Sequence, residues 1–154
     1  MRVFLTGGTG LLGSHLAEHL LQEGHHVRAL VRPSSDASFL AGVGAELVEG
    51  DVTDPVDRLS AAIQGCTHVV HGAALVYSGG EWEAIAAVNV GGTERVLTAA
   101  AQSRVEKAVH ISSVAVYGND EEKPDEGEPL RHDLADGDYY ARSKREAEIK
   151  ARRG

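Results

Sequence analysis

The N-terminal residues constrain the fold more than any other part of the chain. A short apolar run, Arg2–Thr6, leads into a turn with glycines at Gly7, Gly10 and Gly13, and a segment with helical periodicity follows. Strand, glycine turn and helix in this order are typical of a dinucleotide-binding unit, because glycine permits a tight turn, close backbone approach to a pyrophosphate and close packing of helix on strand. Free N–H groups at the start of the helix favour an anion there. The alternative is a glycine-rich turn without a ligand.

Length and composition indicate one globular domain and exclude several classes of protein. The chain has 154 residues and a formal net charge of −8, which argues against a nucleic-acid or anionic-membrane surface. No segment approaches the roughly 18 consecutive apolar residues of a membrane span. Because Met1 leads directly into the first strand, we expect no signal peptide. Cys66 is the only cysteine, so no internal disulfide exists and a reducing cytoplasm is expected.

Strand-like and helical segments alternate along the chain. The predicted strands are Arg2–Thr6, His26–Val31, Glu46–Glu49, His68–His71 and Ala108–Ser112, and the predicted helices are Leu12–Gln22, Arg58–Ile63, Glu83–Ala101 and a segment from Tyr139 onward. This alternation predicts an α/β fold with a doubly wound parallel sheet of Rossmann type and strand order 3-2-1-4-5. The acid-rich segment 118–137 is predicted to be a solvated loop near the mouth of a site.

The residues after the second and third strands bear on the choice of cofactor. An NAD site usually has a carboxylate after the second strand, whereas Arg32 stands here and can pair with a 2′-phosphate. We therefore expect NADP rather than NAD; the alternative is that Arg32 is solvated and both cofactors bind. Asp51 is expected to accept from the adenine amino group and the backbone of Val52 to contact the ring, although Asp51 also suits a local turn.

Two further strand ends are predicted to complete the site. Gly72, Ala73 and Ala74 follow the fourth strand and leave room for a ring or sugar against the backbone. His71, just before them, is expected to be a packing residue rather than a catalyst. Ser112 and Ser113 end the fifth strand, where open α/β sheets bind ligands, and a serine there can share the charge of a reacting oxygen.

Tyr140 and Lys144 are predicted to lie on one face of a helix, at i and i+4. A tyrosine ordinarily titrates at about pH 10 and is a poor base at neutral pH. A nearby ammonium group favours the phenolate, which would then exchange a proton with a hydroxyl or carbonyl oxygen. The same lysine is expected to hold the nicotinamide ribose.

Taken in order, these motifs resemble those of the extended short-chain dehydrogenase/reductase superfamily, which includes sugar-nucleotide epimerases, dehydratases and dihydroflavonol-type reductases. The matching stretches are residues 6–13, 50–52, 71–74, 89–93, 112–118 and the Tyr140-x-x-x-Lys144 pair. The resemblance implies Ser113, Tyr140, Lys144 and Asn89 as catalytic residues. It implies contacts to the cofactor from Gly7, Gly10, Leu11, Leu12, Gly13, Arg32, Asp51, Val52, Gly72, Ala73, Ala74, Ser112, Tyr140 and Lys144.

The resemblance also implies the reaction class and leaves alternatives open. Hydride transfer between a nicotinamide and a carbon bearing a hydroxyl or carbonyl is expected, with NADPH-dependent reduction favoured. Dehydration is disfavoured because Ser113 is not a threonine followed by an acidic pair. The alternatives are a nucleotide-sugar epimerase with retained NAD, and a dinucleotide-binding module without turnover.

Members of this superfamily extend well beyond this length and carry a C-terminal substrate lobe. Residues 1–154 are therefore expected to be the NAD(P)-binding and catalytic domain, with the lobe that selects a small-molecule substrate absent from this chain. The resemblance and the alanine-rich faces of the two long helices also suggest a homodimer, although these alanines would equally well pack inside the chain. No metal site and no nucleic-acid or membrane partner are expected.

Overall fold

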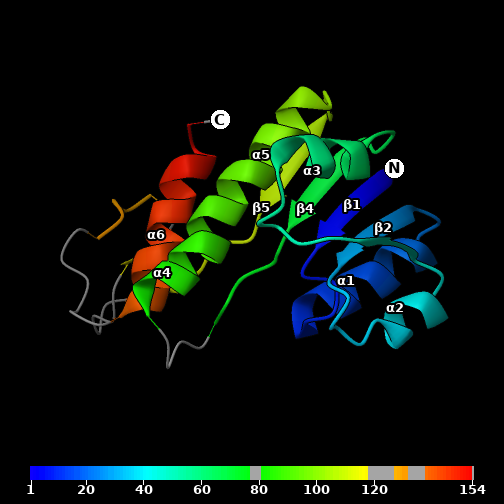
Figure 1. Ribbon diagram of the computed structural model, residues 1–154, viewed down its shortest axis with the longest axis horizontal. Helices are drawn as coiled ribbons and strands as arrows, with labels where there is room; N and C mark the ends of the chain where they lie inside the picture. Colours follow the sequence, from blue (N-terminus) through cyan, green and yellow to red (C-terminus); the bar gives the residue numbers. More distant parts are fainter. Residues whose placement is uncertain (77–80, 118–126, 132–137, 154) are drawn as a thin grey trace.

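The chain forms a parallel sheet with helices on both faces (Figure 1). This computed structural model describes residues 1–76, 81–117, 127–131 and 138–153. Within these residues the strands are β1 (Arg2–Thr6), β2 (His26–Val31), β3 (Glu46–Glu49), β4 (His68–His71) and β5 (Lys107–His110). The helices are α1 (Leu11–Gln22), α2 (Ser38–Gly42), α3 (Val56–Ile63), α4 (Trp82–Ile85), the π-helix η1 (Ala86–Gly92), α5 (Thr93–Gln102), the 3-10 helix η2 (Val114–Tyr117) and α6 (Tyr139–Ala151).

The strand order is β3-β2-β1-β4-β5, and every neighbouring pair is parallel, as predicted. Thr6 at the end of β1 is in register with Leu30 of β2 and His71 of β4. The carboxyl ends of the strands therefore meet at one edge, where ligands of open α/β sheets bind. This register brings the glycine turn, Arg32 and the segment after His71 to the same side of the molecule.

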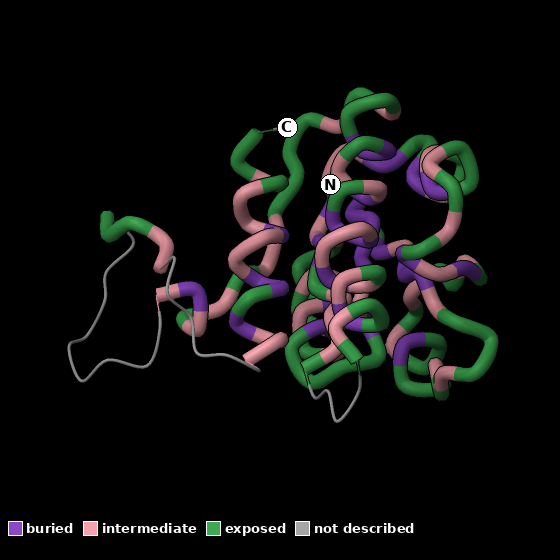
Figure 2. The backbone as a smooth tube through the Cα atoms, turned by 60° about the vertical axis from the view of Figure 1, so that its left-hand side comes forward, coloured by how far each residue is buried: buried purple, intermediate pink, exposed green. Residues whose placement is uncertain are grey.

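The three central strands, β1, β2 and β4, are covered on both faces, and adjacent residues of a strand point to opposite sides. Phe4 packs with Leu59 and Val96 under α3 and α5, whereas Leu5 packs with Ala17 and Leu40 under α1 and α2. The helix α6 lies along α5 and η1 (Figure 1). Figure 2 shows the buried backbone gathered in the interior, with the outer turns of the helices exposed.

A glycine ends the helix α1. Gly24 has a φ of 79°, and its N–H and that of His25 close the helix on Leu21 and Leu20. This left-handed residue is the usual way to end a helix at low cost. The chain then turns directly into β2.

Three predictions about elements need correction or lie outside the described residues, and two short elements lack a prediction. The strand predicted at Ala108–Ser112 is Lys107–His110, because beyond Ile111 the chain turns away toward η2. The helix predicted at Glu83–Ala101 is interrupted by η1, and the short elements α2 and η2 were not predicted. Most of the predicted loop 118–137 lies outside the described residues. Across the described part of the chain, no helix has the length and apolar character needed to cross a membrane.

Candidate cofactor and catalytic site

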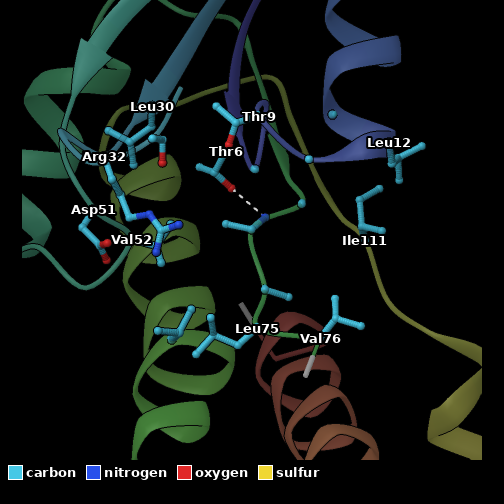
Figure 3. A pocket seen from close by; sticks show the side chains of 18 of the residues that line it. Thr6, Thr9, Leu12, Leu30, Arg32, Asp51, Val52, Leu75, Val76 and Ile111 are labelled. Carbon is cyan, nitrogen blue, oxygen red and sulfur yellow. Dashed lines mark hydrogen bonds between the residues drawn. The ribbon is translucent and has the colours of Figure 1, made fainter. Parts of the chain in front are cut away.

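A cavity of about 480 Å³ runs along the carboxyl edge of the sheet (Figure 3). This size lies within the range typical of small-molecule sites. Arg32 and Asp51 lie at one end of the view and Leu12 and Ile111 at the other. The lining includes every residue predicted to contact the cofactor: Gly7, Gly10, Leu11, Leu12, Gly13, Arg32, Asp51, Val52, Gly72, Ala73, Ala74, Ser112, Tyr140 and Lys144.

Two glycines of the turn leave no space for a side chain. Gly7 has a φ of 76°, and a Cβ there would lie 2.6 Å from the carbonyl carbon of Gly72. A Cβ on Gly13 would overlap the Gly7 carbonyl oxygen and lie 2.8 Å from Cα of Gly8. The turn therefore packs backbone on backbone between β1, α1 and the segment after β4. The close packing of α1 on β1 was predicted from the glycine spacing, whereas the contact with the segment after β4 was not.

The far end of the cavity is formed by residues after β2 and β3. Arg32, Ser35 and Asp51 all line it. Oδ1 of Asp51 also accepts from the backbone N–H and the hydroxyl of Thr53, at 2.8 and 2.7 Å. The turn role foreseen for Asp51 is therefore present, while its contact to an adenine stays a prediction.

A chain of hydrogen bonds connects the end of β1, beside the glycine turn, to η1. The Ala73 N–H donates to Thr6 Oγ1 at 3.2 Å (dashed in Figure 3), and Thr6 Oγ1 lies 2.7 Å from His71 Nδ1. His71 Nε2 lies 2.9 Å from Thr93 Oγ1, which donates to the Asn89 carbonyl at 2.7 Å. Because the single Thr93 hydroxyl proton goes to Asn89, His71 must carry its proton on Nε2 and accept from Thr6 at Nδ1.

His71 is a structural residue, as expected, and it is held in the neutral form. Burial, followed by the charges of His110 and Lys144, lowers the pKa of His71 to about 3. The His110 ring stacks on it with centroids 5.4 Å apart, and burial lowers the pKa of His110 to about 4. Neither ring nitrogen of His110 has a hydrogen-bond partner among the described residues. The two stacked rings are therefore both neutral at pH 7.

Asn89 does not line the cavity, but its side chain holds three segments together. Its amide oxygen accepts from the Leu75 N–H at 2.7 Å, and its amide nitrogen donates to the Leu75 carbonyl at 3.0 Å and to Ser143 Oγ at 2.8 Å. These bonds occupy both amide protons and join η1 to α6 and to the segment after β4. Asn89 lies within the π-helix η1, and such turns often occur at functional sites. The geometry makes Asn89 a positioning residue.

Of the two predicted serines, only Ser112 lines the cavity. Its hydroxyl donates to the carboxylate of Glu148 on α6. Ser113 Oγ accepts from the Ala115 N–H at 3.2 Å, at the start of η2. In this bond the Ser113 oxygen is the acceptor. The bond therefore does not use the hydroxyl proton of Ser113, which can be donated to another oxygen.

Tyr140 and Lys144 both line the cavity from α6, as predicted. The helix begins at a side-chain cap, because Asp138 Oδ1 accepts from the Ala141 N–H at 2.9 Å. Lys144 is only 4% exposed, and its Nζ donates to the Ile111 carbonyl at 2.5 Å. Just outside the cavity, the Trp82 ring lies 5.9 Å from that of Tyr139 and 3.8 Å from the Arg142 guanidinium carbon. These contacts join α4 to the first turn of α6.

Several residues that support the site were not predicted. Thr6, Thr93 and Ser143 are buried hydroxyl residues in the hydrogen-bonded network, and Glu148 receives the Ser112 hydroxyl. Two of these could have been suggested by helical spacing, since Asn89 and Thr93, and Lys144 and Glu148, stand at i and i+4. Thr6 and Ser143 carry no comparable signal.

The described residues fit a nicotinamide dinucleotide. The glycine turn offers backbone without side chains where a pyrophosphate needs close approach, and Arg32 offers a guanidinium at the far end. Tyr140 and Lys144 supply a phenol and a buried amine at the other end. No group of three or more metal-ligating side chains occurs in the part of the chain that the structure describes.

Comparison with known proteins gives consistent matches. The profile of the "NAD dependent epimerase/dehydratase family" matches residues 3–153. The chain is 36% identical over 132 residues to the 4-hydroxy-2-methyl-3-oxo-4-farnesyl-3,4-dihydroquinoline-1-oxide ketoreductase of Stigmatella aurantiaca, covering 84% of this chain and 39% of the relative. It is 35% identical over 154 residues to the 3 beta-hydroxysteroid dehydrogenase/Delta 5-->4-isomerase of Mycobacterium tuberculosis, covering 96% of this chain and 41% of the relative.

The structural comparison agrees. The enzyme WbmG of Bordetella bronchiseptica, solved in complex with NAD, superposes with a TM-score of 0.85 at 31% identity, covering 100% of this chain and 50% of the other. The chain thus spans half or less of the length of these relatives.

Proposed function

This chain belongs to the NAD dependent epimerase/dehydratase family, and we propose that it forms the cofactor-binding and catalytic part of an NADPH-dependent reductase. One observation carries the proposal: a single cavity joins the glycine turn, Arg32 and the Tyr140–Lys144 pair. When bound, the dinucleotide would supply the hydride. The residues of this chain would bind it, orient the substrate and move a proton.

Each catalytic residue has a role that its surroundings support. Tyr140 would donate the proton to the reacting oxygen during reduction and take it back during oxidation. Ser113, whose hydroxyl proton is not used by its bond to Ala115, would donate a hydrogen bond to the same oxygen. Lys144 would hold the ribose and favour the phenolate, and Asn89 would hold α6 in place.

The preference for NADPH depends on Arg32. Its guanidinium reaches the end of the cavity where the ribose of the adenosine would lie, and the family resemblance places an acidic residue there in NAD enzymes. A guanidinium pairs with a phosphate through charge-assisted hydrogen bonds that a ribose hydroxyl does not offer. Ser35 lines the same end and supplies a further donor.

A second candidate is a nucleotide-sugar epimerase that retains NAD. It is favoured by solved relatives such as WbmG in complex with NAD, and by a UDP-glucose-4-epimerase of Stenotrophomonas maltophila with bound NAD that is 30% identical. Cofactor retained through purification would support the epimerase, whereas cofactor that exchanges freely would support the reductase. A small-molecule substrate is proposed in both cases.

A homodimer and a cytoplasmic location are also proposed. Ala99, Ala100, Ala141 and Ala147 are buried within the chain, so the alanine faces pack internally and support for a homodimer comes from the resemblance. Sedimentation at several concentrations tests it, and a monomer throughout contradicts it. A cytoplasmic location is proposed because the single cysteine, Cys66, is buried and unpaired.

Calorimetric titration with NADPH and NADH separately tests the proposed cofactor. We expect at least tenfold tighter binding of NADPH, equal to about 1.4 kcal/mol. Arg32→Ala should weaken NADPH binding by that factor and leave NADH binding unchanged. Arg58→Ala is the matched control, because Arg58 lies after β3 outside the cavity and pairs with Asp54. Equal affinity for both cofactors in the unaltered chain would remove the argument from Arg32.

A further inference from the structure

Two neighbouring side chains of α6 hold the end of β5. Lys144 Nζ donates to the carbonyl of Ile111, and one helical turn later the Glu148 carboxylate accepts from the hydroxyl of Ser112. The two contacts involve consecutive residues of the segment that leads into Ser113. This segment is therefore fixed against α6 by one cation and one anion.

Glu148 is itself held in a defined position. Arg152, a further turn along α6, donates to Glu148 Oε1 from Nε at 3.0 Å and also from its terminal nitrogen. Partial burial raises the pKa of Glu148, but the hydrogen bonds from Ser112 and Arg152 outweigh burial and leave the pKa below its usual value. The carboxylate is thus charged at neutral pH, with one oxygen toward Arg152 and the other toward Ser112.

Lys144 needs a counter-charge because it is buried. Burial lowers the pKa of Lys144, and the negative charge of Glu148 opposes that effect. Among the residues that the structure describes, the other titratable groups near the amine include His71 on β4, His110 on β5 and Tyr140 on α6. Both histidines are neutral at pH 7, so neither supplies a negative charge.

We propose that Glu148 is a positioning residue of the catalytic site, which holds Lys144 as an ammonium ion and fixes the Ser112–Ser113 segment at the end of β5. An ammonium ion donates three hydrogen bonds and favours the tyrosine phenolate, whereas a neutral amine does neither. Glu148 acts through Lys144 and Ser112 and touches no reacting atom. The inference rests on the proposed function only for the role of Lys144.

The ionisation of Lys144 can be observed directly in the chain without cofactor. The chain contains four lysines, so carbon NMR of protein labelled at the lysine ε-carbon resolves them, and Lys144→Arg identifies the resonance. Glu148→Gln keeps the size of the side chain and removes its charge. We expect the midpoint of the Lys144 titration to fall by about one pH unit.

The chain offers a matched control and a rescue. Glu146 makes the same i,i+4 pair with Arg142 on α6, at 2.9 Å, but it does not reach the end of β5. Glu146→Gln should leave the Lys144 midpoint unchanged, and Glu148→Asp should restore most of the shift because it keeps the charge. A Lys144 midpoint in Glu148→Gln equal to that of the unaltered chain overturns the proposal.

A second variant covers the case in which Glu148→Gln does not fold. Coupling between two ionising groups is reciprocal, so Lys144→Met should raise the titration midpoint of the Glu148 carboxyl. An unchanged Glu148 midpoint in that variant also overturns the proposal. Because neither measurement uses the cofactor, a failure of dinucleotide binding in the calorimetric titration is a separate result that counts against the proposed function alone.

Discussion

Two parts of the cavity are held together by different interactions. The phosphate end is the glycine turn, and the catalytic end is the part lined by Tyr140 and Lys144. At the phosphate end, Gly7 and Gly13 bring backbone against backbone, and what matters is the absence of side chains. The catalytic end is held by a chain of buried polar side chains that starts at β1, beside the glycine turn, and passes through β4, α5 and η1 to α6. A ligand at the first end meets donors fixed by local chain geometry, whereas at the second it meets groups whose positions depend on contacts between distant segments.

The largest effect should come from the group that touches the reacting atoms. Tyr140→Phe removes the proposed proton donor and should lower the turnover number for carbonyl reduction by 10²–10⁴-fold, with the cofactor Kd little changed. Tyr139→Phe is the matched control, because Tyr139 packs on Trp82 and is not among the residues lining the cavity. Steady-state kinetics with NADPH measures both variants. Activity above a tenth of normal in Tyr140→Phe contradicts the proton-transfer role.

A smaller effect, on stability, is expected at the catalytic end. Asn89→Ala leaves the part-buried Leu75 N–H and carbonyl without their side-chain partner and removes the donor to the buried Ser143 hydroxyl, and the free energy of unfolding should fall by about 3 kcal/mol. Urea unfolding measures it. Gln102→Ala, which loses only an exposed contact to Ser60, should change stability by less than about 0.5 kcal/mol. If the two variants were equally stable, the catalytic end would not be held by its polar network.

At the phosphate end we expect a loss of stability that has a steric cause. Gly13→Ala forces a methyl group against the Gly7 carbonyl, so we expect a loss of about 2 kcal/mol in stability and weaker cofactor binding. Gly42→Ala is the matched control, because a Cβ there meets nothing within 4 Å and alanine favours the helix. Thermal unfolding and calorimetric titration compare the two. Unchanged cofactor binding in Gly13→Ala would argue against a pyrophosphate at this turn.

The smallest effect, counted per pH unit, is the loss of stability at low pH that His71 and His110 cause. The unfolded chain protonates His71 and His110 below about pH 6.5, whereas the folded chain holds them neutral down to about pH 3 and 4. Stability is therefore full above pH 6.5 and falls as the pH is lowered, by up to about 1.4 kcal/mol per pH unit for each histidine.

His110→Phe keeps a ring in the stack and should roughly halve this slope between pH 6.5 and 5. His15→Gln, on the exposed side of α1, should leave the slope unchanged. Urea unfolding at several pH values measures both. An unaltered slope in His110→Phe would show that His110 is not kept neutral by the fold.

The difference between the two ends of the cavity also explains which parts of the fold and of the site the sequence predicts. The sheet order and the cavity-lining residues of the phosphate end follow from local motifs, because a glycine turn needs only its own neighbours. The hydrogen bonds from Thr6 to His71 and from Asn89 to Ser143 join residues 65 and 54 positions apart, and no periodicity indicates them. The sequence likewise predicts continuous α-helix where the π-helix at Asn89 lies, because the apolar spacing there differs little from that of its flanks. The roles of Ser113, Tyr140 and Lys144 stay predictions.

The contact of Trp82 with Tyr139 and Arg142 makes the intrinsic tryptophan fluorescence a probe of the junction of α4 and α6. Trp82 is the only tryptophan, so its emission arises wholly from the junction of α4 and α6, one residue away from Tyr140 along the helix. Reduced nicotinamide absorbs where indole emits, and the oxidised form does not. Loss of fluorescence on adding the reduced dinucleotide, without a matching loss on adding the oxidised one, would report energy transfer from this junction to a ring bound beside it.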